Sequence, residues 1–88
     1  MYKVVFSNRA KKSLGKLDKQ VASTIMKWVI KNLVNCEDPR IHGHVLRGKF
    51  EGCWRYRIGN YRIIARIEDN QLKIIALDIG HRRDIYKK

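Results

Sequence analysis

Acidic residues are scarce in this chain of 88 residues, where 8 Asp and Glu stand against 20 Lys and Arg. The formal net charge is +12 and the isoelectric point is near 10.2. A charge of this size opposes folding through self-repulsion and favours a polyanionic partner. Nucleic acid is the leading candidate, ahead of an acidic protein or an anionic membrane surface. Solubility alone does not require so high a charge.

Cysteine and long apolar runs are also scarce. The two cysteines, Cys36 and Cys53, are too few for a secreted disulfide scaffold and lack the spacing of metal ligands. No segment approaches the length of a transmembrane helix, and the start "MYKVVFSNRA" lacks the apolar run of a signal peptide. We therefore expect free thiols, no membrane association and a cytoplasmic location.

The chain has one proline and no repeat, linker or low-complexity stretch, so we expect one domain over residues 1–88. Residues 2–6 read as a strand, and Ser7 or Asn8 can cap a helix that follows. Asp18 can cap a second, amphipathic helix, in which apolar residues recur about every four positions from Val21 to Leu33.

A loop rich in glycine follows the second helix and can hold a short strand around Val45-Leu46. Three strand signals come next, at 52–58, 61–68 and 72–79. The predicted order is β-α-α-β-β-β. We expect an α+β fold in which an N-terminal helical hairpin packs on one face of an antiparallel sheet and leaves the other face partly open.

The stretch "CWRYRIGNYRII", residues 53–64, predicts a tight hairpin with Gly59-Asn60 at its tip. A two-residue turn places Arg57 directly opposite Arg62, which destabilises an isolated hairpin by ~0.2–1 kcal/mol. Because side chains alternate across a strand, the apolar residues share one face and the arginines the other. No Asp or Glu lies between 53 and 66. Guanidinium groups bind phosphate bidentately, so we predict a phosphate-binding face made of Arg55, Arg57, Arg62 and Arg66.

The tail "HRRDIYKK" follows a strand that we expect to end at Gly80. A histidine, two arginines and a tyrosine one strand away from the arginines suit phosphodiester chemistry: His81, Arg82, Arg83 and Tyr86. Plainer interpretations stay open, since His81 can be a surface histidine and Tyr86 can pack against the sheet.

His42 and His44 flank Gly43 and could suggest a metal site. No Cys, Asp or Glu pattern completes such a site, so we predict neither a metal nor a cofactor. Trp28 and Trp54 lie in apolar patterns and are expected in the core rather than stacked on bases.

The pieces "LRG", "W-R-R-G-YR" and "IGHRR-IY" together resemble the RelE toxin family of bacterial toxin–antitoxin systems, within the RelE/ParE superfamily. The likeness runs from "FSNRAKKSLGKL" to "DIYKK", nearly the whole chain. It implies cleavage of messenger RNA in the ribosomal A site, in contact with 16S ribosomal RNA. It also implies neutralisation by a cognate acidic antitoxin in a hetero-oligomeric complex.

The resemblance also implies roles for particular residues. Arg55 and Arg57 match two positions that are lysines in well-studied members, and Arg62 matches the arginine after the hairpin tyrosine. Tyr86 matches a C-terminal tyrosine, and either Arg82 or Arg83 matches the arginine after the glycine. The predicted catalytic set is Arg55, Arg57, Arg62, His81, Arg82 and Tyr86, and the predicted RNA-binding set is Arg47, Lys49, Arg66 and Arg83.

RNA can be cut without a metal when its own 2′-OH attacks the adjacent phosphorus. The step needs a base, an acid and stabilisation of the phosphorane charge. Arginines suit the stabilising role, but a guanidinium with a pKa above ~12 is a poor base. His81 and Tyr86 are therefore the acid–base candidates, each able to contribute ~10²–10⁴-fold.

Two other functions stay open. The chain could be a non-enzymatic toxin like the ParE branch, which binds and poisons DNA gyrase, or an inactive basic RNA-binding module. The nuclease hypothesis predicts that Arg62→Ala or Arg82→Ala abolishes growth arrest without unfolding the protein.

Overall fold

The computed structural model describes residues 1–81, so the predicted site residues Arg82, Arg83 and Tyr86 lie outside the described part. Its helices and strands follow the predicted order closely. They are β1 (Lys3–Phe6), α1 (Asn8–Gly15), α2 (Lys19–Asn32), β2 (Gly43–Val45), β3 (Trp54–Ile58), β4 (Tyr61–Glu68) and β5 (Lys73–His81). Single 3₁₀ turns lie at Gly48–Phe50 and Asp69–Gln71.

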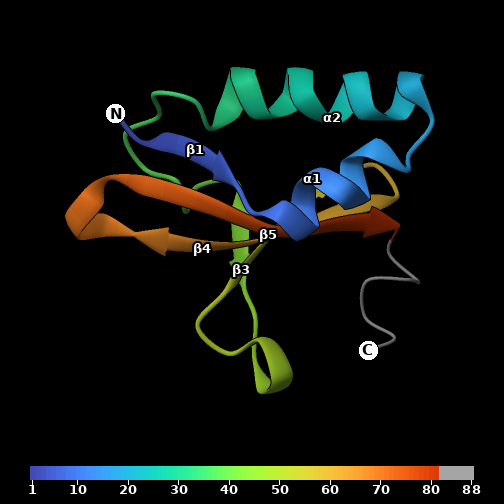
Figure 1. Ribbon diagram of the computed structural model, residues 1–88. Coiled ribbons are helices and arrows are strands. Elements are labelled where there is room, and N and C mark those ends of the chain that lie inside the picture. The colour runs from blue at the N-terminus through green and yellow to red at the C-terminus, as the bar shows by residue number, and fades with distance from the viewer. Residues whose placement is uncertain (82–88) are drawn as a thin grey trace.

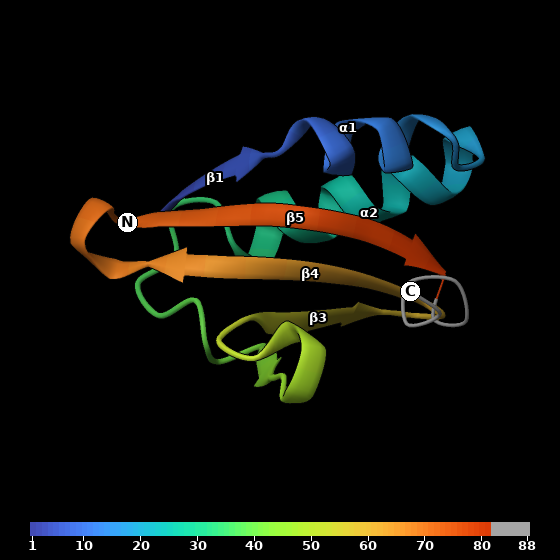
Figure 2. The same ribbon diagram turned by 60° about the horizontal axis from the view of Figure 1, so that its bottom comes forward.

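The strands form one five-stranded sheet in the order β1-β5-β4-β3-β2. Figure 1 shows α2 lying along one side of this sheet, and Figure 2 shows β5, β4 and β3 side by side. The predicted α+β fold is confirmed. One detail is corrected: β1 runs parallel to β5, with Lys3 in register with Lys73, so the sheet is mixed rather than wholly antiparallel. Parallel neighbours require a long connection, and here almost the whole chain lies between the two strands.

Both helices begin at the predicted caps. The Ser7 hydroxyl oxygen accepts a hydrogen bond from the Ala10 amide at 3.0 Å, and its O–H donates to the Leu77 carbonyl of β5 at 3.0 Å. The Asp18 carboxylate accepts from the Gln20 amide at 3.1 Å. Caps of this kind contribute about 1 kcal/mol each, and Ser7 also fastens the start of α1 to the sheet.

The core lies between α2 and the sheet face that α2 covers. Ile25, Val29 and Leu33 of the predicted apolar stripe are each 1% exposed. They pack in one cluster with Tyr56 of β3 and with apolar residues of β4 and β5, namely Ile63, Ala65, Ile74, Ala76 and Ile79. Burial of this face fixes which side chains of the hairpin point to the opposite side of the sheet.

Within the described residues, no helix is long and apolar enough to span a membrane.

Candidate nucleic-acid interface: the arginine face

The arginine face is the side of the sheet away from α2, and it carries Arg55 and Arg57 of β3 and Arg62 and Arg66 of β4. The predicted register is confirmed: Ile58 pairs with Tyr61, Arg57 with Arg62 and Arg55 with Ile64. Gly59 at the tip has a φ of 60°, a left-handed conformation that glycine adopts without strain. The turn at Gly59 and the alternation of side chains along each strand therefore place the arginines on one face.

The four arginines are not equally accessible, a difference that the alternation of side chains does not predict. Arg62 is only 3% exposed. Its Nη1 donates to the carbonyls of Gly59 at 3.2 Å and Tyr61 at 3.1 Å, so the guanidinium holds the tip of the hairpin. Arg57, directly opposite, is exposed. The pair that appeared purely repulsive in the sequence thus contains one structural and one accessible cation.

Arg66 has a counter-charge that the sequence interpretation overlooked. Its Nε lies 2.8 Å from the Glu68 carboxylate, two residues further along the same strand. Glu68 lies just beyond the acid-free stretch 53–66. Because an exposed ion pair of this kind is worth about 0–1 kcal/mol, a phosphate can replace Glu68 at little cost.

Arg55 lies at the centre of the face and is partly buried. Its Nε atom is buried and has no hydrogen-bond partner among residues 1–81. A buried donor without a partner costs about 1–3 kcal/mol. An anionic ligand at this position would relieve that cost.

Arg47 and Lys49 are exposed and lie in the segment that joins β2 to β3, with Lys49 in the 3₁₀ turn Gly48–Phe50. Figure 1 shows this segment projecting from the sheet on the side away from α2, which is the side of the arginine face. Both predicted RNA-binding residues therefore extend the basic surface beyond the sheet.

His81 is not brought to the arginine face. The last strand continues one residue beyond Gly80, so alternation still governs the direction of the His81 side chain. Gly80 pairs with Arg62, and His81 pairs with Tyr61. The His81 ring lies edge-on to the Tyr61 ring at a centroid distance of 5.4 Å, on the side of the helices.

A different histidine lies on the arginine face. His44 of β2 pairs directly with Arg55 of β3 and is exposed. The sequence interpretation considered this residue only as a metal ligand. The short strand expected around Val45-Leu46 would have located His44 on this face if its pairing with residues 54–56 had been predicted.

Arg40 is a further basic residue that sequence reasoning missed. Its guanidinium lies 5.5 Å from the centre of the Trp54 ring and pairs with the Asp69 carboxylate at 2.8 Å. The Tyr2 hydroxyl donates to the same carboxylate at 2.6 Å. The hydrogen bonds from Arg40 and Tyr2 lower the pKa of Asp69. Arg40 is thereby fixed to the end of the sheet rather than to the arginine face.

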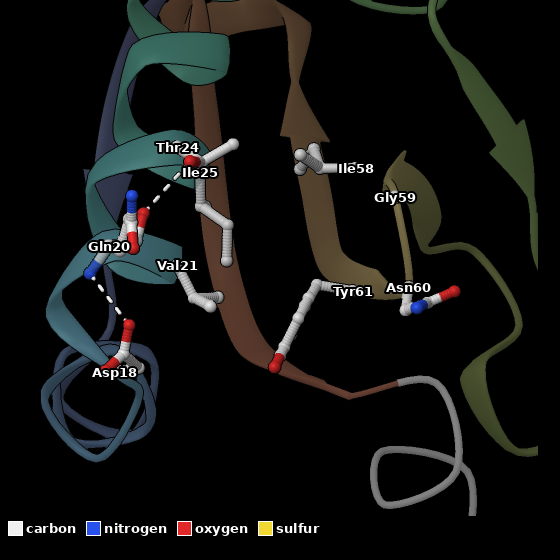
Figure 3. Close-up of a pocket in the computed structure, with 9 residues that line it drawn as sticks. All are labelled: Asp18, Gln20, Val21, Thr24, Ile25, Ile58, Gly59, Asn60 and Tyr61. Atoms are coloured by element: carbon white, nitrogen blue, oxygen red, sulfur yellow. Dashed lines mark hydrogen bonds between the residues drawn. The ribbon is translucent and has the colours of Figure 1, made fainter.

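An open cavity of about 470 Å³ lies between α2 and the hairpin tip. Figure 3 shows Val21 and Ile25 of α2 facing Ile58 and Tyr61 across it. None of the described residues that line this cavity is basic, so among residues 1–81 it is distinct from the arginine face. No group of three His, Cys, Asp or Glu side chains in the described part of the chain could hold a metal ion.

Comparison with known proteins gives consistent results. Residues 4–86 match the family model described as the ParE toxin of the type II toxin–antitoxin system parDE. Toxin RelG of Mycobacterium tuberculosis is 30% identical over 87 residues, which cover 99% of this chain and 98% of RelG.

Solved structures agree with the sequence comparisons. The crystal structure of the toxin–antitoxin complex RelBE2 from M. tuberculosis matches with a TM-score of 0.83 and 28% identity, over 92% of this chain and 98% of the matched one. The isolated E. coli RelE toxin matches with a TM-score of 0.74 and 27% identity, over 98% and 92% of the two chains.

Proposed function

The chain belongs to the ParE toxin family of type II toxin–antitoxin systems, and from this premise we propose that it is a ribosome-dependent mRNA endonuclease that inhibits translation. The observation that carries the proposal is the arginine face. On it, Arg55, Arg57 and Arg62 lie at neighbouring positions of the paired strands β3 and β4. Similarity to toxins named RelG and RelE over nearly the whole chain supports it.

The proposed reaction is an attack of the mRNA 2′-OH on the adjacent phosphorus, without a metal. The O2′–P bond forms, the P–O5′ bond breaks, and the products are a 2′,3′-cyclic phosphate and a 5′-OH. Negative charge accumulates on the phosphorane oxygens, where fixed guanidinium groups stabilise the transition state. Because Arg62 is held by two carbonyls and Arg55 is partly buried, little reorganisation is needed when this charge develops.

The proposed roles divide by position in the fold. Arg55 and Arg57 are proposed to contact the reacting phosphate, together with Arg82 or Arg83 and Tyr86, which the family resemblance adds. The buried Arg62 is proposed to stabilise the phosphate through its charge. The exposed residues Arg47, Lys49 and Arg66 are proposed to bind neighbouring phosphates of the RNA. Such contacts are sequence-independent and sensitive to salt.

A cognate antitoxin is the expected protein partner, because matching structures include RelBE complexes from M. tuberculosis and E. coli. We propose that this antitoxin is acidic, forms a hetero-oligomer with the toxin and opposes the charge of +12. The proposed site of action is the cytoplasm, where ribosomes translate mRNA.

Primer extension on cellular mRNA after induction of the chain tests this proposal. The nuclease function predicts new 5′ ends inside translated regions, in phase with codons, and their loss in Arg57→Ala. Intact transcripts in growth-arrested cells would contradict it.

The description of the matching family model favours one alternative, a ParE-like toxin that acts on DNA gyrase without cleaving RNA. A toxin that acts in this way would not use the arginine face for phosphoryl transfer. The same induced cells distinguish the two functions, because gyrase poisoning damages DNA and leaves mRNA uncut.

A further inference from the structure

We propose that His44 is the general base of the RNA cleavage reaction, an inference that rests on the proposed nuclease function. Its placement comes from the sheet register. β2 pairs antiparallel with β3, and His44 is directly opposite Arg55. Directly opposed residues have Cβ atoms about 4.5–5.5 Å apart and side chains on the same face. The His44 side chain therefore lies beside Arg55 on the arginine face, which also carries Arg57 and Arg62.

His44 differs from the other histidines because its side chain is free of polar and ring contacts within residues 1–81 and can meet a ligand. The His42 ring lies edge-on to Trp28 at 6.0 Å, and the His81 ring lies against Tyr61 at 5.4 Å. In contrast, the His44 side chain makes no hydrogen bond, ion pair or ring contact with any described residue, and His44 is exposed. β2 is the last strand in the sheet order, so one side of His44 is open to a ligand.

The groups that face His44 from β3 are cationic or neutral. Across β3 they are Arg55, directly opposite, and Cys53 and Arg57 on the diagonals. In the chain on either side of β2, the titratable residues are His42 before it and Arg47, Lys49 and Glu51 after it. The carboxylate in the same cross-sheet row is Asp78 of β5, two strands beyond Arg55.

That carboxylate is already engaged at the other edge of the sheet. Asp78 pairs with Arg9 at 3.2 Å and accepts a hydrogen bond from the Ser13 hydroxyl at 2.9 Å. It is therefore held away from the arginines, and His44 is the described side chain on this face whose chemistry suits a general base.

The proton balance of the step is simple. Neutral His44 takes the proton of the 2′-OH as O2′ attacks phosphorus, and the guanidinium groups stabilise the phosphorane. The P–O5′ bond then breaks and O5′ takes up a proton from solvent. His44 returns its proton to solvent after the cyclic phosphate leaves, so no oxidant, reductant or metal is required.

The test is single-turnover cleavage of mRNA on programmed ribosomes by wild type, His44→Gln and His44→Ala. Loss of a general base should lower the cleavage rate ~10²–10⁴-fold while ribosome binding is unchanged. The wild-type rate should fall as pH is lowered, because only a neutral imidazole accepts a proton. His44→Gln should lose this pH dependence, and added imidazole should restore part of the His44→Ala rate.

His42→Gln is the matched control, since it lies two residues away and outside the arginine face; it should retain the wild-type rate and pH profile. Thermal unfolding of each variant shows whether it is folded. A folded His44→Gln protein with the wild-type rate and pH profile would overturn the proposal while leaving the nuclease function intact. Absence of cleavage by wild type would overturn both.

Discussion

Arg62 shows how one side chain can serve both the fold and the site. A guanidinium that is 3% exposed and donates to two carbonyls of the hairpin tip stabilises the turn, yet its charge remains on the face that carries Arg55 and Arg57. The sequence indicated the charge but not the burial, because alternation assigns a face and says nothing about depth. The expectation that Arg62→Ala would leave folding untouched is therefore revised.

Arg62→Ala is predicted to lower the free energy of unfolding by about 1–3 kcal/mol, since it leaves the carbonyls of Gly59 and Tyr61 without their charged donor. The exposed partner is the matched control: Arg57→Ala should change stability by less than about 0.5 kcal/mol. Urea denaturation measures both, and equal stability losses would contradict the structural role. Growth arrest should be lost in both variants.

Tyr56 provides a pH prediction at the same scale. Burial raises the pKa of the Tyr56 phenol, and its hydroxyl donates to the Pro39 carbonyl at 2.5 Å. The folded state therefore binds this proton more tightly than the unfolded chain does. Its stabilising contribution is complete below the ordinary tyrosine value of ~10 and is lost as pH rises above it.

Tyr56→Phe should lower stability at neutral pH by about 0.5–1.5 kcal/mol and should flatten the decline at alkaline pH. Thermal unfolding between neutral and alkaline pH measures both effects. A decline as steep as that of wild type would show that Tyr56 is not its source.

The helices and strands differ in how far nearby residues of the sequence determine their arrangement. The β3–β4 hairpin was predictable down to its register, because Gly59-Asn60 and the alternation of Trp54, Tyr56 and Ile63 specify it within a dozen residues. The parallel pairing of β1 with β5 was not predictable, since no nearby turn records it. Nor was the role of β2, which has three residues and a position set by β3. For this reason His44 was overlooked and β5 was expected to end one residue early, at Gly80, because both depend on where a strand pairs or ends.

Gly43 makes the pairing of β2 testable. A Cβ at this position would lie 3.0 Å from the Tyr56 ring and 3.3 Å from the Trp54 ring, tighter than most packed contacts, so the rings would have to shift by a few tenths of an ångström. Gly43→Val should therefore push β2 from β3 and cost about 1–3 kcal/mol. It should also slow mRNA cleavage by moving His44 relative to Arg55.

Gly15→Ala is the control for Gly43→Val, because a Cβ there meets nothing within 4 Å. At the end of α1 it should be neutral or stabilising by up to about 1 kcal/mol. Unaltered stability and activity in Gly43→Val would mean that β2 does not position the site.

The whole molecule is basic, and its two sides carry different kinds of basic residue. The helices contribute lysines, whereas the sheet face away from α2 carries arginines and His44. Lysine attracts a polyanion as a point charge, and arginine orients phosphate through its planar fork. A net charge of +12 thus brings the chain to RNA, and the geometry of one face determines what happens there.

Binding to RNA is accordingly predicted to weaken linearly in a plot of log affinity against log salt concentration. Replacing both Arg47 and Lys49 by Ala should reduce the slope by about 0.7 per lost contact to single-stranded RNA. Filter binding at several salt concentrations measures this, and an unchanged slope would exclude these residues from the interface.

The most direct test of the account uses an mRNA with one 2′-deoxy nucleotide at the position that the wild-type chain cleaves on programmed ribosomes. Attack by the 2′-OH predicts that the all-ribose mRNA yields a 2′,3′-cyclic phosphate and a 5′-OH, and that the deoxy-substituted mRNA stays intact at that position. Cleavage of the deoxy-substituted mRNA, or no cleavage of either, would contradict it.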